Sequence, residues 1–391
     1  MFRLFQLLAI AAFWTACQSG TSPTREAEQI FKSVAQQYAP DSREDLFQIH
    51  FKEDGSKLVA SGETSSPEGK QALFLDLAKA KLSAIDSIRV LPEESMGTKV
   101  WGLVNVSVCN IRALPGHSAE MISQAILGTP VHLLKKSGHW LFIQTPDRYL
   151  GWVDDDAIYQ TDVEGMDAWR SGKRVIFLPN LGSGFNPETK EAVTDLVAGS
   201  ILKVVESLKK EIVAGMPDGR RMSLPNESIM DFNLWKEKGL PTAEDLSIFA
   251  KALLGRPYLW GGTSTKGVDC SGFVKTVYFL NGYILARDAS LQYLHGNFTD
   301  PQMGYASLKA GDLVFFGRKA VGDVPAKATH VGLYLGDGAY INSSGYVRID
   351  SFDSSRKNFS QLRADNWLGG RTILGITGDK GIVRVKNHPW Y

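Results

Sequence analysis

The spacing of apolar positions changes along the chain from helical to strand-like. Between Arg25 and Tyr38 apolar residues recur with helical spacing, which predicts an amphipathic helix. Alternation over residues 46–51, followed after a turn by an apolar run at 58–61, predicts a β-hairpin. A second helix is predicted over residues 67–85 and a strand over 87–91. These elements make a small α/β unit, to which the sequence assigns no chemistry.

Short strands separated by turns begin near Val100, a pattern that favours small β-barrels. One group of predicted strands covers residues 104–108, 131–135, 140–144 and 151–153. A second, weaker group covers residues 174–177, 201–206, 211–214 and 220–223, with a tight turn at 217–219.

The rest of the chain is organised around residues 258–277, which read YLWGGTSTKGVDCSGFVKTV. A helix capped by Thr242 is predicted to precede this stretch and to end at Gly255. From Phe273 onward the apolar residues take helical spacing, so Cys270 lies at the start of a helix. Unpaired amides and the positive dipole end favour a thiolate there, which is the reactive state of a cysteine nucleophile. The alternative is a buried cysteine that packs as a small apolar side chain.

Composition indicates a folded protein of two to four domains, because 391 residues with 43% hydrophobic positions exceed one ordinary core. The 43 basic and 42 acidic residues leave no field that would attract nucleic acid, so no nucleic-acid partner is expected. Three cysteines cannot form a disulfide framework, and no cysteine and histidine cluster has the spacing of a zinc site. We expect no metal and no other cofactor.

The N-terminus has the pattern of an export signal. Residues 1–3 carry a positive charge, and residues 4–14 are almost wholly apolar but too short to span a membrane. The Thr-Ala-Cys ending resembles the lipobox of bacterial lipoproteins, which implies lipidation of Cys17 and a membrane anchor in the cell envelope. Trp14 stands where that box usually has leucine, and a plain signal peptide is the alternative. Residues 19–23 read as a tether.

A cysteine nucleophile needs a base, which is normally histidine. Five of the seven histidines lie outside the region that follows Cys270. Of the other two, His295 lies in a turn-rich stretch, whereas His330 begins a predicted β-hairpin. His330 is therefore the expected base.

The hairpin also supplies a third polar residue. If residues 336–338 form a three-residue loop, Leu335 pairs with Ala339, and His330 and Asn342 lie on the same face. A two-residue turn would put them on opposite faces. Asparagine can accept from one imidazole nitrogen and leave the other to face the cysteine, as in a Cys-His-Asn arrangement. The alternative is a structural histidine beside a turn asparagine.

The first barrel segment resembles a bacterial SH3 domain. Its stretch VCNIRALPGHSAEMISQAILGTPVHLL, followed by GHWLFIQTPDRYLGWVDDDAI, has an Asn-x-Arg turn, a Gly-Thr-Pro before a strand, a tryptophan on the next strand and a Gly-Trp-Val close. The second group of strands reads as a weaker copy. The resemblance implies two such domains in tandem, which bind cell-wall peptides.

The C-terminal region, roughly residues 246–391, resembles the NlpC/P60 family of papain-like cell-wall peptidases. The resemblance rests on Asp-Cys-Ser-Gly at the helix start, GDLVFFG at 311–317 and Thr-His-Val-Gly at 329–332. Within this family the region resembles more narrowly the γ-D-glutamyl-L-diamino acid endopeptidases, also called dipeptidyl-peptidase VI. This narrower resemblance rests on YLWGG, on Arg-Asp-Ala at 287–289 and on the HPWY ending. The match implies Cys270 as nucleophile, His330 as base and Asn342 as the third residue, where many members have histidine.

That group cuts after a free L-Ala-γ-D-Glu dipeptide, so the resemblance implies a site for an N-terminal ammonium. We expect Asp269 to accept this amine or to cap the helix, and the first SH3-like domain to close the site. The implied substrate-binding residues are Glu120, Tyr149, Tyr258, Trp260, Asp269 and Ser271. For Glu120 the alternative is a solvated surface charge.

We therefore expect a multidomain α+β protein. Its parts are a lipoprotein-type signal at 1–17, a tether and small α/β unit at 18–95, SH3-like β-barrels at 96–160 and 161–235, and a papain-like NlpC/P60 peptidase domain at 240–391. The expected activity is hydrolysis of peptidoglycan-derived peptides by an exported monomer that contacts the membrane only through its lipid anchor. Two alternatives stay open, an endopeptidase of intact peptidoglycan and an inactive wall-binding lipoprotein.

Overall fold

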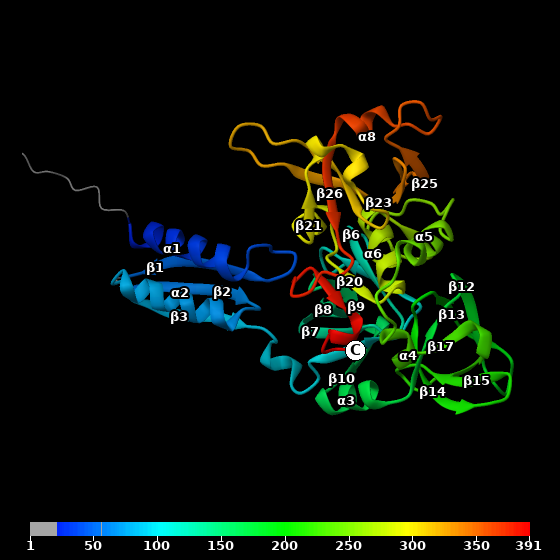
Figure 1. The fold of residues 1–391 in the computed structure, drawn as a ribbon. Coiled ribbons are helices and arrows are strands. Elements are labelled where there is room, and N and C mark those ends of the chain that lie inside the picture. The colour runs from blue at the N-terminus through cyan, green and yellow to red at the C-terminus, as the bar shows by residue number, and fades with distance from the viewer. Residues whose placement is uncertain (1–21, 56) are drawn as a thin grey trace, which may run out of the picture. The chain divides into compact units, whose positions relative to one another are not determined.

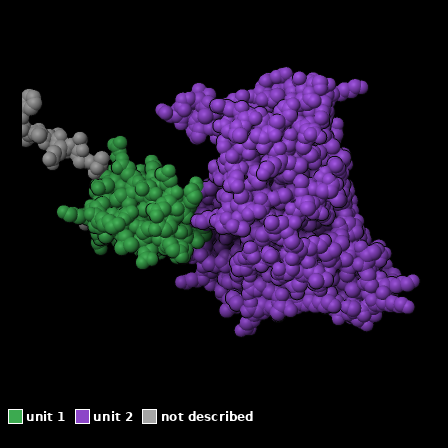
Figure 2. Space-filling model, in the orientation of Figure 1, with its two compact units in different colours: residues 1–40, 47–89 green, residues 41–46, 90–391 purple. Residues whose placement is uncertain are grey.

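The computed structural model describes residues 22–55 and 57–391. The chain forms two compact units, one of residues 22–40 and 47–89, the other of residues 41–46 and 90–391 (Figure 2). Cys17 and the signal segment lie outside the described residues. No helix in the described ranges is long and apolar enough to cross a membrane.

The smaller unit is a three-stranded sheet packed against two helices. Its elements are α1 (Pro23–Tyr38), β1 (Phe47–Asp54), β2 (Lys57–Thr64), α2 (Pro67–Lys79) and β3 (Ala84–Val90), and the strand order is β1-β2-β3. β1 and β2 pair antiparallel, which confirms the predicted hairpin. Ala27 and Val34 of α1 and Leu73 and Leu77 of α2 are buried in its core, because their helical spacing places them on one face.

The second helix is shorter than the sequence predicts. α2 ends at Lys79 and not near Ile85, because Lys81 adopts a left-handed φ of 59°. The N–H of Leu82 bonds to the carbonyl of Leu77, and that of Lys81 to the carbonyl of Ala78. This is the Schellman pattern, which satisfies the last carbonyls of a helix and turns the chain, here into β3.

The larger unit begins with a seven-stranded sheet. Its strands are β4 (Trp101–Val104), β5 (Val108–Arg112), β6 (Met121–Ile126), β7 (Pro130–Ser137), β8 (Trp140–Gln144), β9 (Leu150–Asp154) and β10 (Ile158–Thr161). The single strand predicted over 104–108 is wrong. The chain bends at residues 105–107, so that β4 pairs with β7 and β10 while β5 pairs with β6 and β9.

A second seven-stranded sheet follows α3 (Val163–Ser171). Its strands are β11 (Arg174–Phe177), β12 (Leu181–Phe185), β13 (Ala192–Val197), β14 (Ile201–Ser207), β15 (Glu211–Gly215), β16 (Arg221–Pro225) and β17 (Ile229–Asp231). The first sheet has the order β10-β4-β7-β8-β9-β5-β6, and the second has β17-β11-β14-β15-β16-β12-β13. If the strands of each sheet are numbered from one to seven in chain order, both sheets have the order 7-1-4-5-6-2-3. This identity supports the expectation of two related domains in tandem.

The C-terminal region contains α4 (Phe232–Lys236), α5 (Ala243–Lys251) and a six-stranded antiparallel sheet against which α6 (Cys270–Leu280) packs (Figure 1). The sheet order is β21-β26-β22-β23-β24-β25. These strands are β21 (Asn297–Thr299), β22 (Leu313–Arg318), β23 (Lys327–Gly336), β24 (Ala339–Ser344), β25 (Tyr346–Ser351) and β26 (Trp367–Thr372). The remaining elements are β18 (Thr263–Ser264), β19 (Gly267–Val268), β20 (Tyr283–Leu285), α7 (Ala289–Gln292), α8 (Gln361–Asp365) and β27 (Ile382–Arg384). Thr242 caps α5, as predicted. The helix ends at Lys251 and not at Gly255, and Gly255, with a φ of +80°, lies in the turn that follows.

The hairpin of β23 and β24 reaches the predicted register by another route. Its turn has two residues, since Gly336 pairs with Ala339, and not the three-residue loop with Leu335 opposite Ala339. The shorter turn alone would move His330 and Asn342 to opposite faces of the sheet. A β-bulge between Tyr334 and Gly336 adds one residue to β23 and so brings the two side chains back to one face. His330 and Asn342 therefore lie on the same face.

The start of α6 is held against the loop before it by a close backbone approach. A Cβ on Gly272 would lie 1.9 Å from the carbonyl oxygen of Gly262, a distance that no side chain tolerates. Glycine is required here by the space between two backbones.

We expect Gly272→Ala to lower the free energy of unfolding by about 3 kcal/mol, at the upper end of overpacking effects, in urea titrations. Gly239→Ala is the matched control, because no atom lies within 4 Å of its Cβ position, and it should change stability by less than about 0.5 kcal/mol. Equal effects of the two substitutions would contradict the close approach.

Candidate functional site

The candidate nucleophile is the first residue of α6. Cys270 is 8% exposed, and Asp269 caps the helix by accepting from the N–H of Gly272 at 2.7 Å. The backbone N–H of Val331 in β23 favours the charged form of the thiol and so lowers its pKa. Cys270 therefore lies beside the strand that carries His330.

The helix start does not make Cys270 a thiolate. Burial raises the pKa of its thiol to about 11, and the negative charge of Asp269 adds to the rise. The Val331 amide and the Arg287 guanidinium oppose it but are outweighed. The expectation of a thiolate at rest is corrected, because desolvation of the charged form exceeds the effect of the helix end.

The orientation of Asn342 determines the tautomer of His330. His330 Nε2 lies 2.8 Å from Asn342 Oδ1, while Asn342 Nδ2 donates to Asp350 Oδ2 at 3.0 Å. Because the amide nitrogen faces a carboxylate, the amide oxygen faces the imidazole and accepts from Nε2–H. The lone pair of His330 then lies on Nδ1, where it can take a proton. Sequence reasoning missed Asp350, which Arg348 pairs at 3.1 Å.

The imidazole is neutral at rest. Burial lowers the pKa of His330 to about 3, and the positive charge of Arg363 lowers it further. The hydrogen bond to Asn342 acts in the opposite direction. With a neutral thiol and a neutral imidazole, Cys270 has to lose its proton during attack, so the pair is suited to general-base catalysis.

The carboxylate of Asp269 is buried and fully occupied. Its Oδ1 accepts from Gly272 N–H, from Ser271 Oγ at 3.2 Å and from Arg287 Nη1 at 3.2 Å. Its Oδ2 accepts from Gly261 N–H at 3.0 Å and from Arg287 Nη2 at 2.5 Å. Arg287 is 1% exposed, and the neighbouring carboxylates Asp269 and Asp288 raise its pKa against the effect of burial.

These contacts argue against Asp269 as the acceptor of a substrate amine. A carboxylate has about four lone-pair positions, and five donors already surround this one. Asp269 caps α6 and neutralises Arg287, so of the two roles expected for it the structure shows the helix cap. Ser271 likewise donates to Asp269 and accepts from Arg287 Nη1 at 2.9 Å.

A cavity of about 340 Å³ opens beside Cys270. The structure brings all the sequence-predicted substrate-binding residues to its wall, namely Glu120, Tyr149, Tyr258, Trp260, Asp269 and Ser271. Trp260 Nε1 donates to Glu120 Oε1 at 2.8 Å, so this glutamate is held in place although it is exposed. Tyr258 is half-buried, and the negative charge that would develop on Cys270 adds to the burial that raises its pKa.

Asp288 and Glu120 are carboxylates of this cavity that each have one oxygen without a hydrogen bond to the described residues, and Asp288 is the less exposed of the two. Its Oδ2 accepts from Tyr149 Oη at 3.0 Å and from Arg43 Nη1 at 2.7 Å. Oδ1 makes no hydrogen bond with the described residues. Arg43 also pairs with Asp41 and donates to Ser290 Oγ at 3.0 Å. The sequence assigned no chemistry to the segment around Arg43, and no local pattern marks it, because its partner lies 245 residues away.

The seven-stranded sheet of β4 to β10 forms one wall of the cavity and is joined by hydrogen bonds to the region around Cys270. Arg287 Nε donates to Ser123 Oγ at 3.0 Å, and Thr263 Oγ1 donates to the carbonyl of Gln124 at 2.8 Å. Both partners lie in β6. Arg287, which pairs with Asp269, thus also ties β6 to the segment around Cys270.

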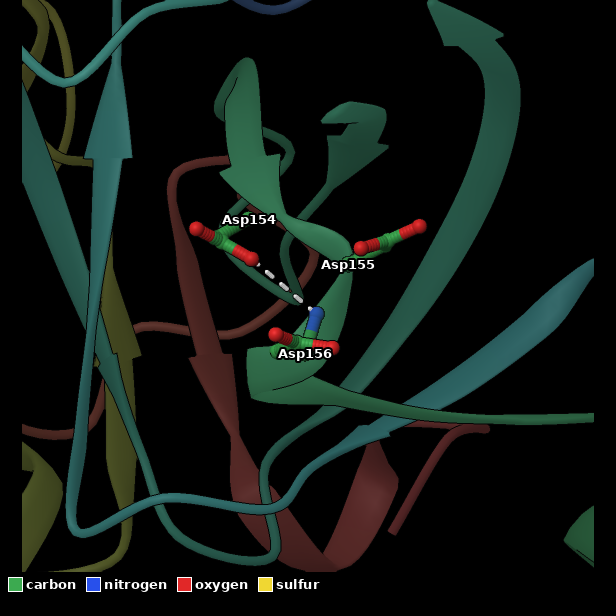
Figure 3. A group of neighbouring side chains, drawn as sticks. All are labelled: Asp154, Asp155 and Asp156. Carbon is green, nitrogen blue, oxygen red and sulfur yellow. Dashed lines mark hydrogen bonds between the residues drawn. The ribbon is translucent and has the colours of Figure 1, made fainter. Parts of the chain in front are cut away.

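Other candidate groups in the described part of the chain have structural partners. Cys109 is buried and its pKa is raised to about 12, and His295 Nδ1 lies 2.6 Å from Asp379. Consecutive aspartates at 154–156 are the one described group of three acidic, histidine or cysteine side chains with metal-ligand spacing. They leave the end of β9 in different directions, Asp154 accepts from the backbone N–H of Asp156, and Lys136 neutralises Asp155 (Figure 3). We assign them no metal.

Comparison with known families decides the nature of this region. Residues 255–365 match the NlpC/P60 family, and residues 111–158 match the bacterial dipeptidyl-peptidase SH3 domain. The chain carries an NlpC/P60 domain behind a bacterial SH3 domain. The NlpC/P60 match includes Cys270, His330, Asn342 and Arg363. The SH3 match includes Glu120 of the cavity wall.

Two relatives align with most of their own length. The γ-D-glutamyl-L-lysine dipeptidyl-peptidase of Bacillus cereus is 27% identical over 281 residues, which is 69% of this chain and 82% of the relative. Dipeptidyl-peptidase 6 of Lysinibacillus sphaericus is 28% identical over 280 residues, which is 66% of this chain and 94% of the relative.

The crystal structure of an NlpC/P60 family protein from Bacillus cereus has a similar fold. It superposes with a TM-score of 0.60 and 22% sequence identity, covering 70% of this chain and 99% of the other. The fold of about 70% of this chain therefore has a precedent in a solved structure.

The pKa of Cys270 predicts a pH profile. Because the pKa lies near 11, the thiolate fraction should grow about tenfold per pH unit below that value. We expect alkylation of Cys270 in the NlpC/P60 domain by iodoacetamide, followed by mass spectrometry, to accelerate continuously from about pH 6 to about pH 10. The variant Cys270→Ala supplies the background from other cysteines. A plateau below about pH 8 would contradict the neutral pair and indicate a thiolate and imidazolium at rest.

Proposed function

We propose that this protein is a cysteine peptidase that hydrolyses the bond between γ-D-glutamate and a diamino acid in peptidoglycan stem peptides with a free N-terminal L-Ala. The observation that carries this proposal is the geometry around one cavity, with Cys270 beside the strand of His330 at one side and the unused oxygen of Asp288 at another. The names of the two long relatives support the same bond, since both are dipeptidyl-peptidases and one is specific in name for γ-D-glutamyl-L-lysine.

The reaction proceeds through a thioester. His330 Nδ1 takes the thiol proton as Cys270 Sγ attacks the γ-carbonyl carbon of the glutamate. Collapse of the tetrahedral intermediate breaks the C–N bond, and His330 gives the proton to the leaving amine of the diamino acid. Water then attacks the thioester carbon while His330 takes its proton, which releases the dipeptide and restores the thiol. Asn342 keeps the imidazole in the required tautomer throughout.

The free amine of the substrate binds between Asp288 and Glu120. Asp288 Oδ1 and Glu120 Oε2 are acceptors without a partner among the described residues, and Tyr149 fixes the Asp288 carboxylate from its other oxygen. Arg43 is shared by Asp41 and Asp288, so the group of one arginine and two aspartates keeps a net charge of −1. That charge offsets the desolvation of an ammonium.

The other wall residues shape the pocket. Trp260 holds Glu120 and covers the substrate, while the Tyr258 hydroxyl makes no hydrogen bond with the described residues and is available to the developing oxyanion. Ser271 accepts a hydrogen bond from Arg287 and helps to hold that side chain in position. The wall formed by the SH3 domain limits the space beyond the amine, which favours a dipeptide over a longer N-terminal chain.

The domain organisation follows the same proposal. Residues 96–160 and 161–235 are tandem SH3-like domains, residues 240–391 the peptidase, and residues 18–95 a tether and accessory unit. The protein acts as a monomer in the cell envelope, where lipidated Cys17, the last residue of the signal region at 1–17, anchors it as the first residue of the mature chain after residues 1–16 are removed. Two alternatives make different use of the same parts, an endopeptidase of intact peptidoglycan and an inactive wall-binding lipoprotein.

We expect the protein to release the dipeptide from L-Ala-γ-D-Glu-L-Lys and to cleave the N-acetylated peptide at least about a hundredfold more slowly, because acetylation removes the charge that Asp288 binds. Liquid chromatography of the products measures both rates. Cys270→Ala should lower the rate at least about a thousandfold. Chelator should have no effect, and loss of activity in its presence would contradict the thiol mechanism. Equal cleavage of both peptides favours the endopeptidase of intact wall, and binding without release favours the inactive protein.

The amine site is tested by comparing two aspartates. Asp288→Asn should raise KM for the free tripeptide roughly tenfold or more and bring its rate close to that of the acetylated peptide. Asp269→Asn should instead lower the thermal unfolding temperature, since it removes the buried partner of Arg287. If Asp269→Asn abolishes the preference for a free amine in a stably folded protein while Asp288→Asn retains it, the assignment is reversed.

A further inference from the structure

A half-buried arginine lies next to the catalytic pair but takes no part in the chemistry described above. Arg363 in α8 lies over the ring of Phe316, with the guanidinium carbon 5.5 Å from the ring centroid. The same ring lies 5.9 Å from the imidazole of His330. Arg363 therefore reaches the neighbourhood of His330 through a shared aromatic ring, and its positive charge lowers the pKa of the imidazole.

Arg363 forms no ion pair in the described part of the chain, although the charge of Asp350 acts on it. One of its five N–H groups makes a hydrogen bond there, from Nη2 to Ser344 Oγ at 3.3 Å. The neighbouring Arg348 pairs with Asp350, and buried Arg287 pairs with Asp269. A partly desolvated charge without a counter-ion costs free energy, so a guanidinium left open beside an active site is suited to an anion that arrives with the substrate.

The side of the site on which Arg363 lies indicates which part of the substrate it meets. Arg363 does not line the cavity that contains Asp288, which takes the N-terminal dipeptide. His330 has to face the leaving amine to give it a proton, and Arg363 approaches His330 across Phe316. Beyond Cys270, the substrate therefore continues toward Arg363 with its diamino acid.

We propose that Arg363 binds a carboxylate of the diamino acid and so selects which stem peptides are cleaved. This inference rests on the proposed function. The planar guanidinium presents paired N–H donors that match a carboxylate, which an ammonium cannot do with the same geometry. A diamino acid offers such a group from two sources, the α-carboxylate of a C-terminal residue and the side-chain carboxylate that diaminopimelate has and lysine lacks.

The test compares three substrates on the full chain. L-Ala-γ-D-Glu-L-lysinamide has no carboxylate on the leaving group, L-Ala-γ-D-Glu-L-Lys has the α-carboxylate, and the α-amide of the diaminopimelate peptide has the side-chain carboxylate alone. We expect kcat/KM of the wild-type protein to be roughly tenfold to a hundredfold higher for at least one carboxylate peptide than for the lysinamide. The carboxylate peptide with the higher kcat/KM shows which of the two carboxylates Arg363 binds.

Arg363→Gln should bring that ratio close to one, and Arg363→Lys should retain part of it. Arg356→Gln is the matched control, because this exposed arginine already pairs with Asp353, and it should leave the ratio unchanged. A wild-type ratio near one, or a ratio that survives Arg363→Gln, overturns the inference while the proposed function stands. A fall in kcat that is equal for all three peptides also overturns it, since Arg363 would then act on the chemistry of Cys270. Failure of the wild-type protein to cleave any of them is a failure of the proposed function itself.

Discussion

The buried carboxylate of Asp269 is the constraint on which the rest of the site depends. A charge taken out of water is tolerated only when donors surround it, and here five groups do so from three parts of the chain. Gly261 brings the preceding loop, Gly272 the start of α6, and Arg287 the segment before α7. Since Arg287 also binds Ser123 in β6, one ion pair fixes Cys270 relative to the wall of its cavity.

The same carboxylate sets the electrostatics of Cys270. Its negative charge and the surrounding burial raise the pKa of the thiol, whereas Arg287 offsets part of that effect. His330 is neutral for the same reason of burial, with Arg363 adding to the shift. A site of this kind keeps its cysteine as a thiol until substrate is in place, and a thiol oxidises less readily than a thiolate. In the proposed reaction His330 then has to remove the thiol proton, which requires the tautomer that Asn342 fixes.

Much of the site could be predicted where a local signal exists. Helical spacing after Phe273 placed Cys270 at a helix start, and alternation along the hairpin placed His330 and Asn342 on one face. The details failed where one residue changes the backbone. Lys81 ended α2 early, residues 105–107 divided a predicted strand, and a bulge replaced the expected three-residue loop. Such single-residue choices depend on packing from outside the segment.

By itself, the sequence determined the type and approximate position of most elements and which residues are candidates for the chemistry of a thiol peptidase, because helix and strand periodicity and motif spacing act over a few neighbouring positions. The tertiary structure decided how those residues are charged and paired. It occupied Asp269 with Arg287, left an oxygen of Asp288 open and brought Arg43 to the cavity across 245 residues. Burial and ion pairing are properties of the space around a group, and distant segments fill that space only when the chain has folded.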